Sequence, residues 1–142
     1  MGKKGESFNG LDDKPHEVDE TMCVIADDSG VLGLGGILGG EETGCTEQTT
    51  NVLIECAWFD PESIAATGRK TGIVSDARYR FERYADPAFV KPGIELATRL
   101  VLDLCGGEPD EVSIAAGVEA PEPVRQFPFG EVPLLTGPQV GS

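Results

Sequence analysis

Carboxylates are the only plentiful side chains in this sequence that could do chemistry, because the usual nucleophile–base pairs are missing. His16 is the only histidine, so a Ser–His–Asp or Cys–His triad would depend on one residue in a polar stretch. No Gly-x-Ser-x-Gly motif occurs. Adjacent acids lie in turn-like stretches, where they are usually solvated: Asp12-Asp13, Asp27-Asp28 and Glu41-Glu42. The residues alone therefore indicate no catalyst.

Glu55 is the most informative acid, because it lies in the middle of the apolar stretch 51–59. The apolar density predicts a buried strand there. A carboxylate at a buried position must be paired, hydrogen-bonded or directed into a cavity, since burying it alone costs several kcal/mol. The alternative is that Glu55 faces solvent on the other side of the strand.

Residues 33–40, Gly-Leu-Gly-Gly-Ile-Leu-Gly-Gly, form an unusual glycine-rich stretch inside a predicted strand. It is not a dinucleotide fingerprint, and no Gly-Lys-Ser/Thr follows it as in a phosphate loop. Glycine within a strand marks a bulge or a place where another group approaches the backbone. A pocket wall lined by backbone and a plain bulged strand are equally compatible with this pattern.

The cysteines are too far apart to indicate a metal site. Cys23, Cys45, Cys56 and Cys105 form no CxxC pair, so we expect no metal and four reduced, mostly buried thiols in a cytoplasmic protein. No apolar run approaches the roughly 18 residues of a membrane helix. The N-terminus has no apolar stretch behind its lysines, so we expect no secretory signal there.

The net charge of −14 argues against broad nucleic-acid binding, which depends on Lys and Arg. Five of the 11 basic residues nevertheless lie between positions 69 and 83, namely Arg69, Lys70, Arg78, Arg80 and Arg83. Only Asp76 and Glu82 oppose them in this window. Ion pairs with surrounding acids are the favoured interpretation, and contact with RNA is the alternative.

Turn and cap signals predict the elements that must position these residues. Residues 22–26 and 31–38 read as a hairpin closed at 27–30. Asp60-Pro61 and Asp86-Pro87 are typical helix starts, and Ser75 or Asp76 caps a helix over 78–84. We also predict a long helix ending at Gly106-Gly107, whose apolar residues pack on the sheet: Ile94, Ala97, Leu100, Val101 and Leu104.

Together these elements predict an α+β fold with a mixed sheet, a hairpin and a C-terminal amphipathic helix. Residues 111–118 read as a final strand, which would close the domain 1–118. Residues 119–142 are interpreted as a linker and the start of a following domain, and residues 1–7 as candidate vector-derived sequence.

Four blocks occur in the order and spacing of a known family. They are Gly35–Gly44, Thr49–Pro61, Ser75–Arg83 with Asp86-Pro87, and Leu104–Gly107. Over roughly residues 8–118 the chain resembles the β subunit of bacterial phenylalanyl-tRNA synthetase, in the C-terminal part of its editing (B3/B4) domain. The resemblance implies a partial editing-domain fold that removes tyrosine wrongly attached to phenylalanine tRNA, in support of protein biosynthesis.

The resemblance also implies roles for individual residues. Glu55 matches the glutamate that hydrogen-bonds the tyrosine phenol, and Gly39 matches a glycine that lines the pocket. Ser75 stands where the family has threonine, and Ala77 matches a small pocket residue. Arg69, Lys70, Arg78 and Arg80 are the candidate contacts to the tRNA acceptor end.

The sequence departs from the family at two places. Tyr84-Ala85 follows Arg83 where the family has Gly-Val, and His16 does not match the histidine of the family, whose segment lies upstream. The pocket is therefore expected to be open on one side. A non-catalytic scaffold that positions tRNA is the alternative function.

The resemblance implies partners as well. It predicts an α subunit in an α2β2 assembly that uses ATP and magnesium, and no cofactor in this chain. A sheet without its full set of strands would expose an edge, so we also expect self-association.

Overall fold

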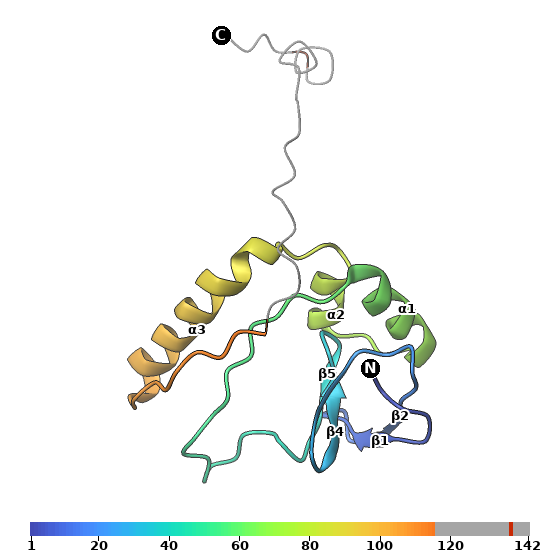
Figure 1. Ribbon diagram of the computed structural model, residues 1–142, viewed down its shortest axis with the longest axis horizontal. Coiled ribbons are helices and arrows are strands. Elements are labelled where there is room, and N and C mark those ends of the chain that lie inside the picture. The colour runs from blue at the N-terminus through green and yellow to red at the C-terminus, as the bar shows by residue number, and fades with distance from the viewer. Residues whose placement is uncertain (116–136, 138–142) are drawn as a thin grey trace. The chain divides into compact units, whose positions relative to one another are not determined.

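The computed structural model describes residues 1–115 and Gly137, and it combines small sheets with helices (Figure 1). The predicted α+β class is confirmed. The chain divides into two compact units, Met1–Pro109 and Asp110–Ser142. Every helix and strand of the described residues lies in the first unit. The domain boundary near residue 118 remains a prediction.

The strands of the described residues form two antiparallel sheets, not the mixed sheet that we expected. A hairpin makes the first sheet and a three-stranded meander makes the second. An isolated antiparallel bridge between Gly10 and Gly40 connects the two. The strand bounds are β1 (Ser7–Asn9), β2 (Pro15–Glu17), β3 (Val24–Asp27), β4 (Gly30–Leu34) and β5 (Leu38–Gly39).

The predicted hairpin between β3 and β4 is confirmed. The Asp27 carboxylate closes its turn by accepting the Ser29 backbone N–H at 2.8 Å. Hydrogen bonds from Ser29 also lower the pKa of Asp27. The second strand is shorter than predicted, because the chain turns at Gly36, which has a φ of +67°, and returns as β5.

The helices begin where their capping residues indicate. Asp60 accepts the Ser63 N–H at 2.8 Å and starts α1 (Pro61–Thr71), and Gly72 ends this helix with a φ of +71°. Ser75, and not Asp76, caps α2 (Asp76–Phe81), which starts and ends earlier than predicted. These boundaries depend on local chemistry, so the sequence predicts them within a few residues.

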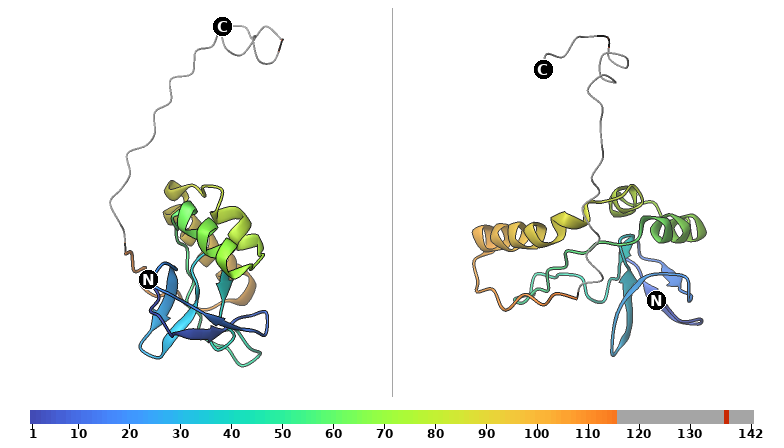
Figure 2. Two further views of the ribbon diagram at one scale, coloured as in Figure 1. Left: turned by 90° about the vertical axis from the view of Figure 1, so that its right-hand side faces the viewer. Right: turned by 45° about the horizontal axis from the view of Figure 1, so that its top comes forward.

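The third helical region starts with Asp86, which caps the short 3-10 helix η1 (Pro87–Phe89). The long helix α3 (Val90–Cys105) continues from it, with Gly106 at its end, as predicted. Its packing differs from the prediction, because Leu100 and Leu104 remain 57% and 76% exposed. Gly93 of α3 instead lies against Phe89 and Cys56. Figure 2 shows α3 extending away from α1 and α2.

The core joins the glycine turn after β4 to the helices. Six side chains are buried: Phe8, Val18, Met22, Leu34, Ile37 and Ile64. A Cβ atom built on Gly36 would lie 2.8 Å from Phe59 and 3.2 Å from Ile64 and Phe81. The Phe59 and Phe81 rings meet edge to face at 5.1 Å. Only glycine permits this approach without displacing the aromatic pair.

The prediction of a buried strand over 51–59 is wrong. These residues form no strand, and the leucine at position 53 is 98% exposed. Segment 51–59 contains no helix or strand, and within the described residues its backbone forms no hydrogen bond to other backbone groups. An apolar segment becomes a strand only when its backbone forms hydrogen bonds to a neighbouring strand. The three-stranded sheet has β5 as an edge strand, and among the described residues no further strand pairs with β5.

The predicted strand over 111–118 is also not seen. Residues 111–115 have no regular structure, and residues 116–118 lie outside the described part of the chain. The alternating apolar pattern there lacks a paired strand among the described residues.

Replacing Gly36 by alanine tests the packing of the glycine turn. We expect Gly36→Ala to lower the free energy of unfolding by about 2–4 kcal/mol, because it adds both a left-handed strain and a clash. Gly72→Ala is the matched control: it has a similar φ but no atom within 4 Å of the new Cβ. It should cost about 1 kcal/mol, for the strain alone. Urea unfolding measures both values, and equal losses would contradict the packing role.

The unpaired segment 51–59 predicts self-association. The segment is extended and its side chains are mostly apolar, so its backbone can form hydrogen bonds with a strand edge of another copy. We therefore expect the mass from light scattering to rise with protein concentration. Leu53→Lys places a charge in this segment and should restore the monomer. A monomeric mass for the unmodified chain at all concentrations would contradict this prediction.

Candidate functional site

Ser75 connects the two elements that carry most of the predicted pocket residues. Its hydroxyl donates to the backbone carbonyl of Ile37 at 2.6 Å. The same oxygen accepts the backbone N–H of Arg78 at 3.1 Å, which caps α2. Ile37 immediately precedes β5. The hydroxyl of Ser75 thus fixes the start of α2 against the glycine turn.

Gly39 lies in β5 and is exposed. A Cβ atom on it would lie 3.2 Å from the Leu11 side chain, and only Leu11 atoms are found within 4 Å of it among the described residues, its chain neighbours aside. Another backbone segment approaches the glycine-rich stretch closely, as the pocket-wall interpretation requires. A Cβ atom on Gly40 would lie 2.2 Å from the Leu32 carbonyl oxygen. A register shift between Ile25 and Ala26 shows that the sheet is also bulged. The pocket wall remains a prediction.

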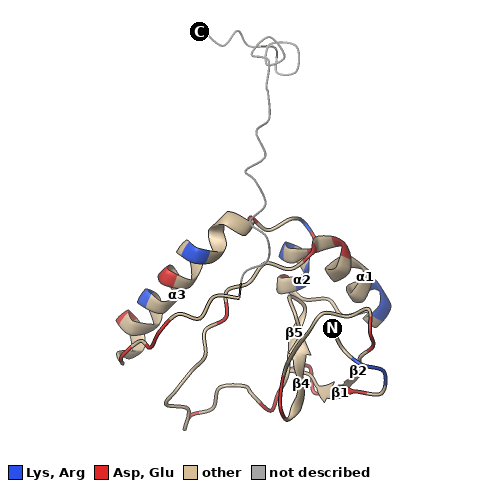
Figure 3. Ribbon diagram, viewed as in Figure 1, with Lys and Arg blue, Asp and Glu red and all other residues tan. Residues whose placement is uncertain are grey.

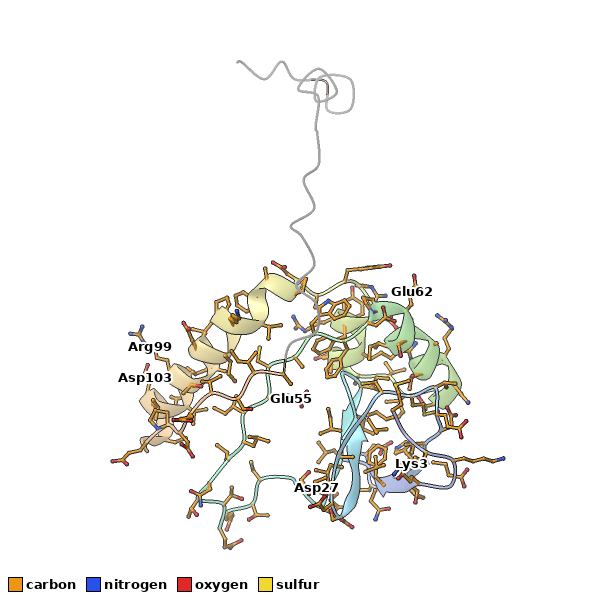
Figure 4. All side chains as sticks on the ribbon, in the orientation of Figure 1. Lys3, Asp27, Glu55, Glu62, Arg99 and Asp103 are labelled. Carbon is orange, nitrogen blue, oxygen red and sulfur yellow. The ribbon has the colours of Figure 1, made fainter. Side chains whose placement is uncertain are left out.

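Ala77 and Glu55 occupy exposed positions. Ala77 lies in the first turn of α2, two residues after Ser75. Glu55 lies on the extended segment, and in the view of Figure 4 it appears between α3 and strands β4 and β5. Within the described residues, its carboxylate makes no hydrogen bond or ion pair. The structure brings Gly39, Ser75 and Ala77 onto connected elements, and among the described residues no hydrogen bond or ion pair joins Glu55 to them.

The basic residues between 69 and 83 mostly form ion pairs, as the favoured interpretation predicted. Figure 3 shows basic positions in blue on α1 and α2. Lys70 pairs with Asp19, and this link connects α1 to the turn after β2. Arg78 donates to the Ile73 carbonyl at 2.6 Å and to Glu82 at 3.0 Å. These two candidate tRNA contacts therefore have structural roles.

The other candidate tRNA contacts, Arg69 and Arg80, are exposed. Neither takes part in an ion pair within the part of the chain that the structure describes. They are consequently available to an external anion.

The Glu82 carboxylate accepts hydrogen bonds from both neighbouring arginines, Arg78 and Arg83. Its partial burial by itself raises the pKa, but hydrogen bonds from Arg78 and Arg83 outweigh this effect and leave the pKa of Glu82 lowered. Arg83 also donates to the Tyr79 carbonyl at 2.8 Å. Its guanidinium lies 3.9 Å from the centre of the Tyr79 ring.

Tyr79 is not among the residues predicted for the site, although its spacing to Arg83 is that of neighbours on a helix. Tyr79 lines a shallow hollow of about 180 Å³ together with Ser75 and three further residues: Val74, Arg78 and Glu82. The hollow therefore adjoins the Ser75 hydroxyl. Its presence depends on how α2 packs, which residue spacing alone does not reveal.

His16, the one histidine, lies in the β1–β2 hairpin. Its Nε2 is 2.9 Å from an Asp12 carboxylate oxygen, and this hydrogen bond lowers the pKa of Asp12. The ring also contacts Phe8 with centroids 5.5 Å apart. Its nitrogen is thus engaged in the hairpin.

The cysteines are free, but they are less buried than predicted. Cys23 and Cys56 are half-buried, and Cys45 and Cys105 are exposed. Among the described residues, no group of three or more side chains of the metal-binding types gathers in one place. Within the same residues, no helix is long and apolar enough to cross a membrane.

Comparison with known proteins gives consistent matches. Residues 1–106 match the B3/4 domain family. The chain is 52% identical over 136 residues to a phenylalanine–tRNA ligase beta subunit of Mesorhizobium japonicum, covering 96% of this chain and 17% of that protein. The corresponding subunit of Nitrobacter winogradskyi is 55% identical over 134 residues, covering 94% and 16%. That of Paramagnetospirillum magneticum is 57% identical over 115 residues, covering 81% and 14%.

The chain therefore spans about one sixth of the length of these relatives. The resemblance seen in the sequence blocks is confirmed by these matches.

The link between Lys70 and Asp19 can be tested by titration. The hydrogen bond from Lys70, with further bonds from Thr21, lowers the pKa of Asp19 to about 2. Because this value is below the ordinary 3.8, the link stabilises the fold above pH 4. That stabilisation is lost as the pH falls toward 2. We expect Lys70→Met to raise the pKa of Asp19 toward 3.8, as measured by NMR of the carboxyl carbon.

Arg69→Met is the matched control, since Arg69 is the neighbouring base on α1 without this contact. It should leave the pKa of Asp19 unchanged. An equal rise in both variants would show that general charge, and not the Lys70 contact, holds Asp19 ionised.

Proposed function

The chain belongs to the B3/4 domain family, and we propose that it is an editing module that binds and hydrolyses Tyr-tRNA(Phe). The support is its similarity to phenylalanine–tRNA ligase beta subunits together with the hydrogen bond from Ser75 to Ile37. That bond holds the element carrying Gly39 beside the start of α2, where Ala77 lies. The observation that carries the proposal is this contact.

The need for such a module follows from the limits of selection by size. A pocket shaped for phenylalanine rejects tyrosine poorly when the two differ by one added hydroxyl. A second site must therefore recognise the hydroxyl directly, through a polar group that accepts its hydrogen bond. Glu55 has an uncommitted carboxylate that can accept a phenol O–H.

Small residues leave room for the aromatic ring in this proposal. Gly39 has only Leu11 near its missing Cβ, and Ala77 projects only a methyl group. Ser75 keeps its hydroxyl in the bond to Ile37, so it positions the wall and does not act as a nucleophile. The extended segment bearing Glu55 must come against this wall when substrate binds.

Hydrolysis then requires a water molecule at the ester. The water oxygen forms a bond to the carbonyl carbon, the bond to the ribose oxygen breaks, and the ribose oxygen takes the proton. Tyrosine and free tRNA result. His16 is engaged with Asp12, so the water is activated by the substrate hydroxyl and by positioned polar groups.

A tRNA-positioning scaffold without catalysis is the second candidate. The exposure of Glu55, and the lack of any hydrogen bond or ion pair to its carboxylate among the described residues, favour this alternative. Either function places the chain in the cytoplasm, in an α2β2 assembly whose α subunit uses ATP and magnesium. RNA contact would then be limited to the acceptor end.

Deacylation of Tyr-tRNA(Phe) tests the proposal. We expect the chain to release tyrosine faster than the spontaneous rate, and both Glu55→Ala and Gly39→Trp to reduce release about tenfold or more. Glu55→Ala removes the acceptor of the phenol, and Gly39→Trp fills the space for the ring.

Glu47→Ala removes another exposed carboxylate and serves as the matched control, with unchanged release. Release that ignores both Glu55→Ala and Gly39→Trp would exclude the assigned pocket. Binding of tRNA without any release would favour the scaffold.

A further inference from the structure

Two tyrosines stand out on the surface just beyond the proposed pocket. Tyr79 is 62% exposed on α2, and Tyr84 is 72% exposed shortly after this helix ends. They are the only tyrosines of the chain. Both are more exposed than the other exposed aromatic residues of the described chain, Trp58 at 44% and Phe89 at 55%. Aromatic rings usually lose most of their exposure in a folded domain, so these two rings are available to a ligand.

Tyr84 occupies a backbone conformation that favours glycine. Its φ is +64°, in the left-handed region, where a bulky side chain is uncommon. Nothing in the described packing requires an aromatic side chain there, because the ring is mostly exposed. Neither the backbone conformation nor the packing therefore explains why this residue is a tyrosine, and we look for the reason in what its side chain can bind.

Two exposed arginines lie near these tyrosines in the sequence, and one of them contacts the Tyr79 ring. Arg83 lies over the Tyr79 ring and is held in place by its bonds to the Tyr79 carbonyl and to Glu82. Arg80 is exposed on the same short helix and has no ion pair among the described residues. Flat rings with fixed guanidinium groups bind unpaired nucleotides, since bases stack on the rings and phosphates pair with arginine.

The position of these residues connects them to the proposed substrate. Tyr79 and Ser75 line the same hollow, so a ligand bound in this hollow would lie beside both residues. The window 69–83 carries a local excess of basic over acidic residues, although the whole chain has a net charge of −14. At physiological salt, charges more than about 8 Å apart are largely screened from each other, so the local charge of this window matters more to RNA than the net charge of the whole chain.

We propose that Tyr79, Arg80, Arg83 and Tyr84 form a stacking surface for the unpaired 3′ end of the tRNA. This inference rests on the proposed function, because it places the terminal nucleotides beside the pocket for the aminoacyl group. The surface recognises single-stranded RNA by its base faces and backbone, and it does not read a duplex. Arg83 pairs with Glu82, as Lys70 pairs with Asp19, but Arg83 also contacts the Tyr79 ring. Tyr79, Arg83 and Tyr84 therefore join Arg80 in this surface.

Fluorescence anisotropy with a labelled single-stranded RNA of about eight nucleotides ending in CCA tests this surface. We expect Tyr79→Leu and Tyr84→Gly each to weaken binding about fivefold or more, as the loss of one stacked base predicts. Tyr84→Gly also relieves the left-handed strain, so its fold should be at least as stable. Tyr79→Phe keeps the ring and should bind within about twofold of the unmodified chain.

Salt dependence tests the arginines. Two phosphate contacts predict a slope of about −1.4 for the logarithm of the binding constant against the logarithm of salt concentration. Arg80→Gln should reduce this slope by about 0.7. Arg99→Gln, an exposed arginine on α3, is the matched control and should leave the slope unchanged.

Several outcomes would overturn the surface. They are an unmodified chain that binds no single-stranded RNA at low salt, equal binding of a duplex of the same sequence, or Tyr79→Leu and Tyr84→Gly variants that bind as before. The editing function is scored separately, by release of tyrosine from Tyr-tRNA(Phe). Loss of RNA binding in the tyrosine variants without any hydrolysis by the unmodified chain would support the surface and exclude editing.

Discussion

The close approach between the glycine turn and the helical layer determines most of this structure. Gly36 lies where any Cβ atom would collide with Phe59, Ile64 and Phe81. The turn must therefore be glycine for the sheet and helices α1 and α2 to share one core. Once the turn is fixed, β5 follows at once, and the Ile37 carbonyl comes within reach of the Ser75 hydroxyl. The proposed pocket wall is a consequence of that packing.

The fold could be predicted wherever the cause lies within a few residues. Asp60, Ser75 and Asp86 each accept a nearby backbone N–H, so short-range chemistry alone sets where the helices begin. The strand over 51–59 failed because a strand is defined by a partner, and the apolar pattern says nothing about whether one is present. The error also removes the reason for expecting a buried Glu55. The exposed position of Glu55 agrees with the alternative, in which its carboxylate faces solvent.

The candidate site shows the same division between local and distant causes. Residue type and family resemblance named Gly39, Ser75 and Ala77, but the contact that joins their elements spans 38 positions of sequence. The pairing of Lys70 with Asp19 spans 51 positions. Charge counting predicted that the basic window would form ion pairs, yet it could not say which bases would remain exposed. Only the packing of α1 and α2 separates Lys70 and Arg78 from Arg69 and Arg80.

The short helix α2 carries residues of both proposed functions. Six residues are too few to form a stable helix alone, so its position depends on the Ser75 cap and on the bond from Arg78 to the Ile73 carbonyl. These contacts hold one end of the helix against the glycine turn and leave Tyr79 at the surface. The wall of the proposed aminoacyl pocket and the Tyr79 end of the proposed RNA surface therefore depend on the same contacts. A nucleotide stacked on Tyr79 would be placed by the same hydrogen bonds that place the pocket, which is the geometry that removal of an amino acid from the end of an RNA requires.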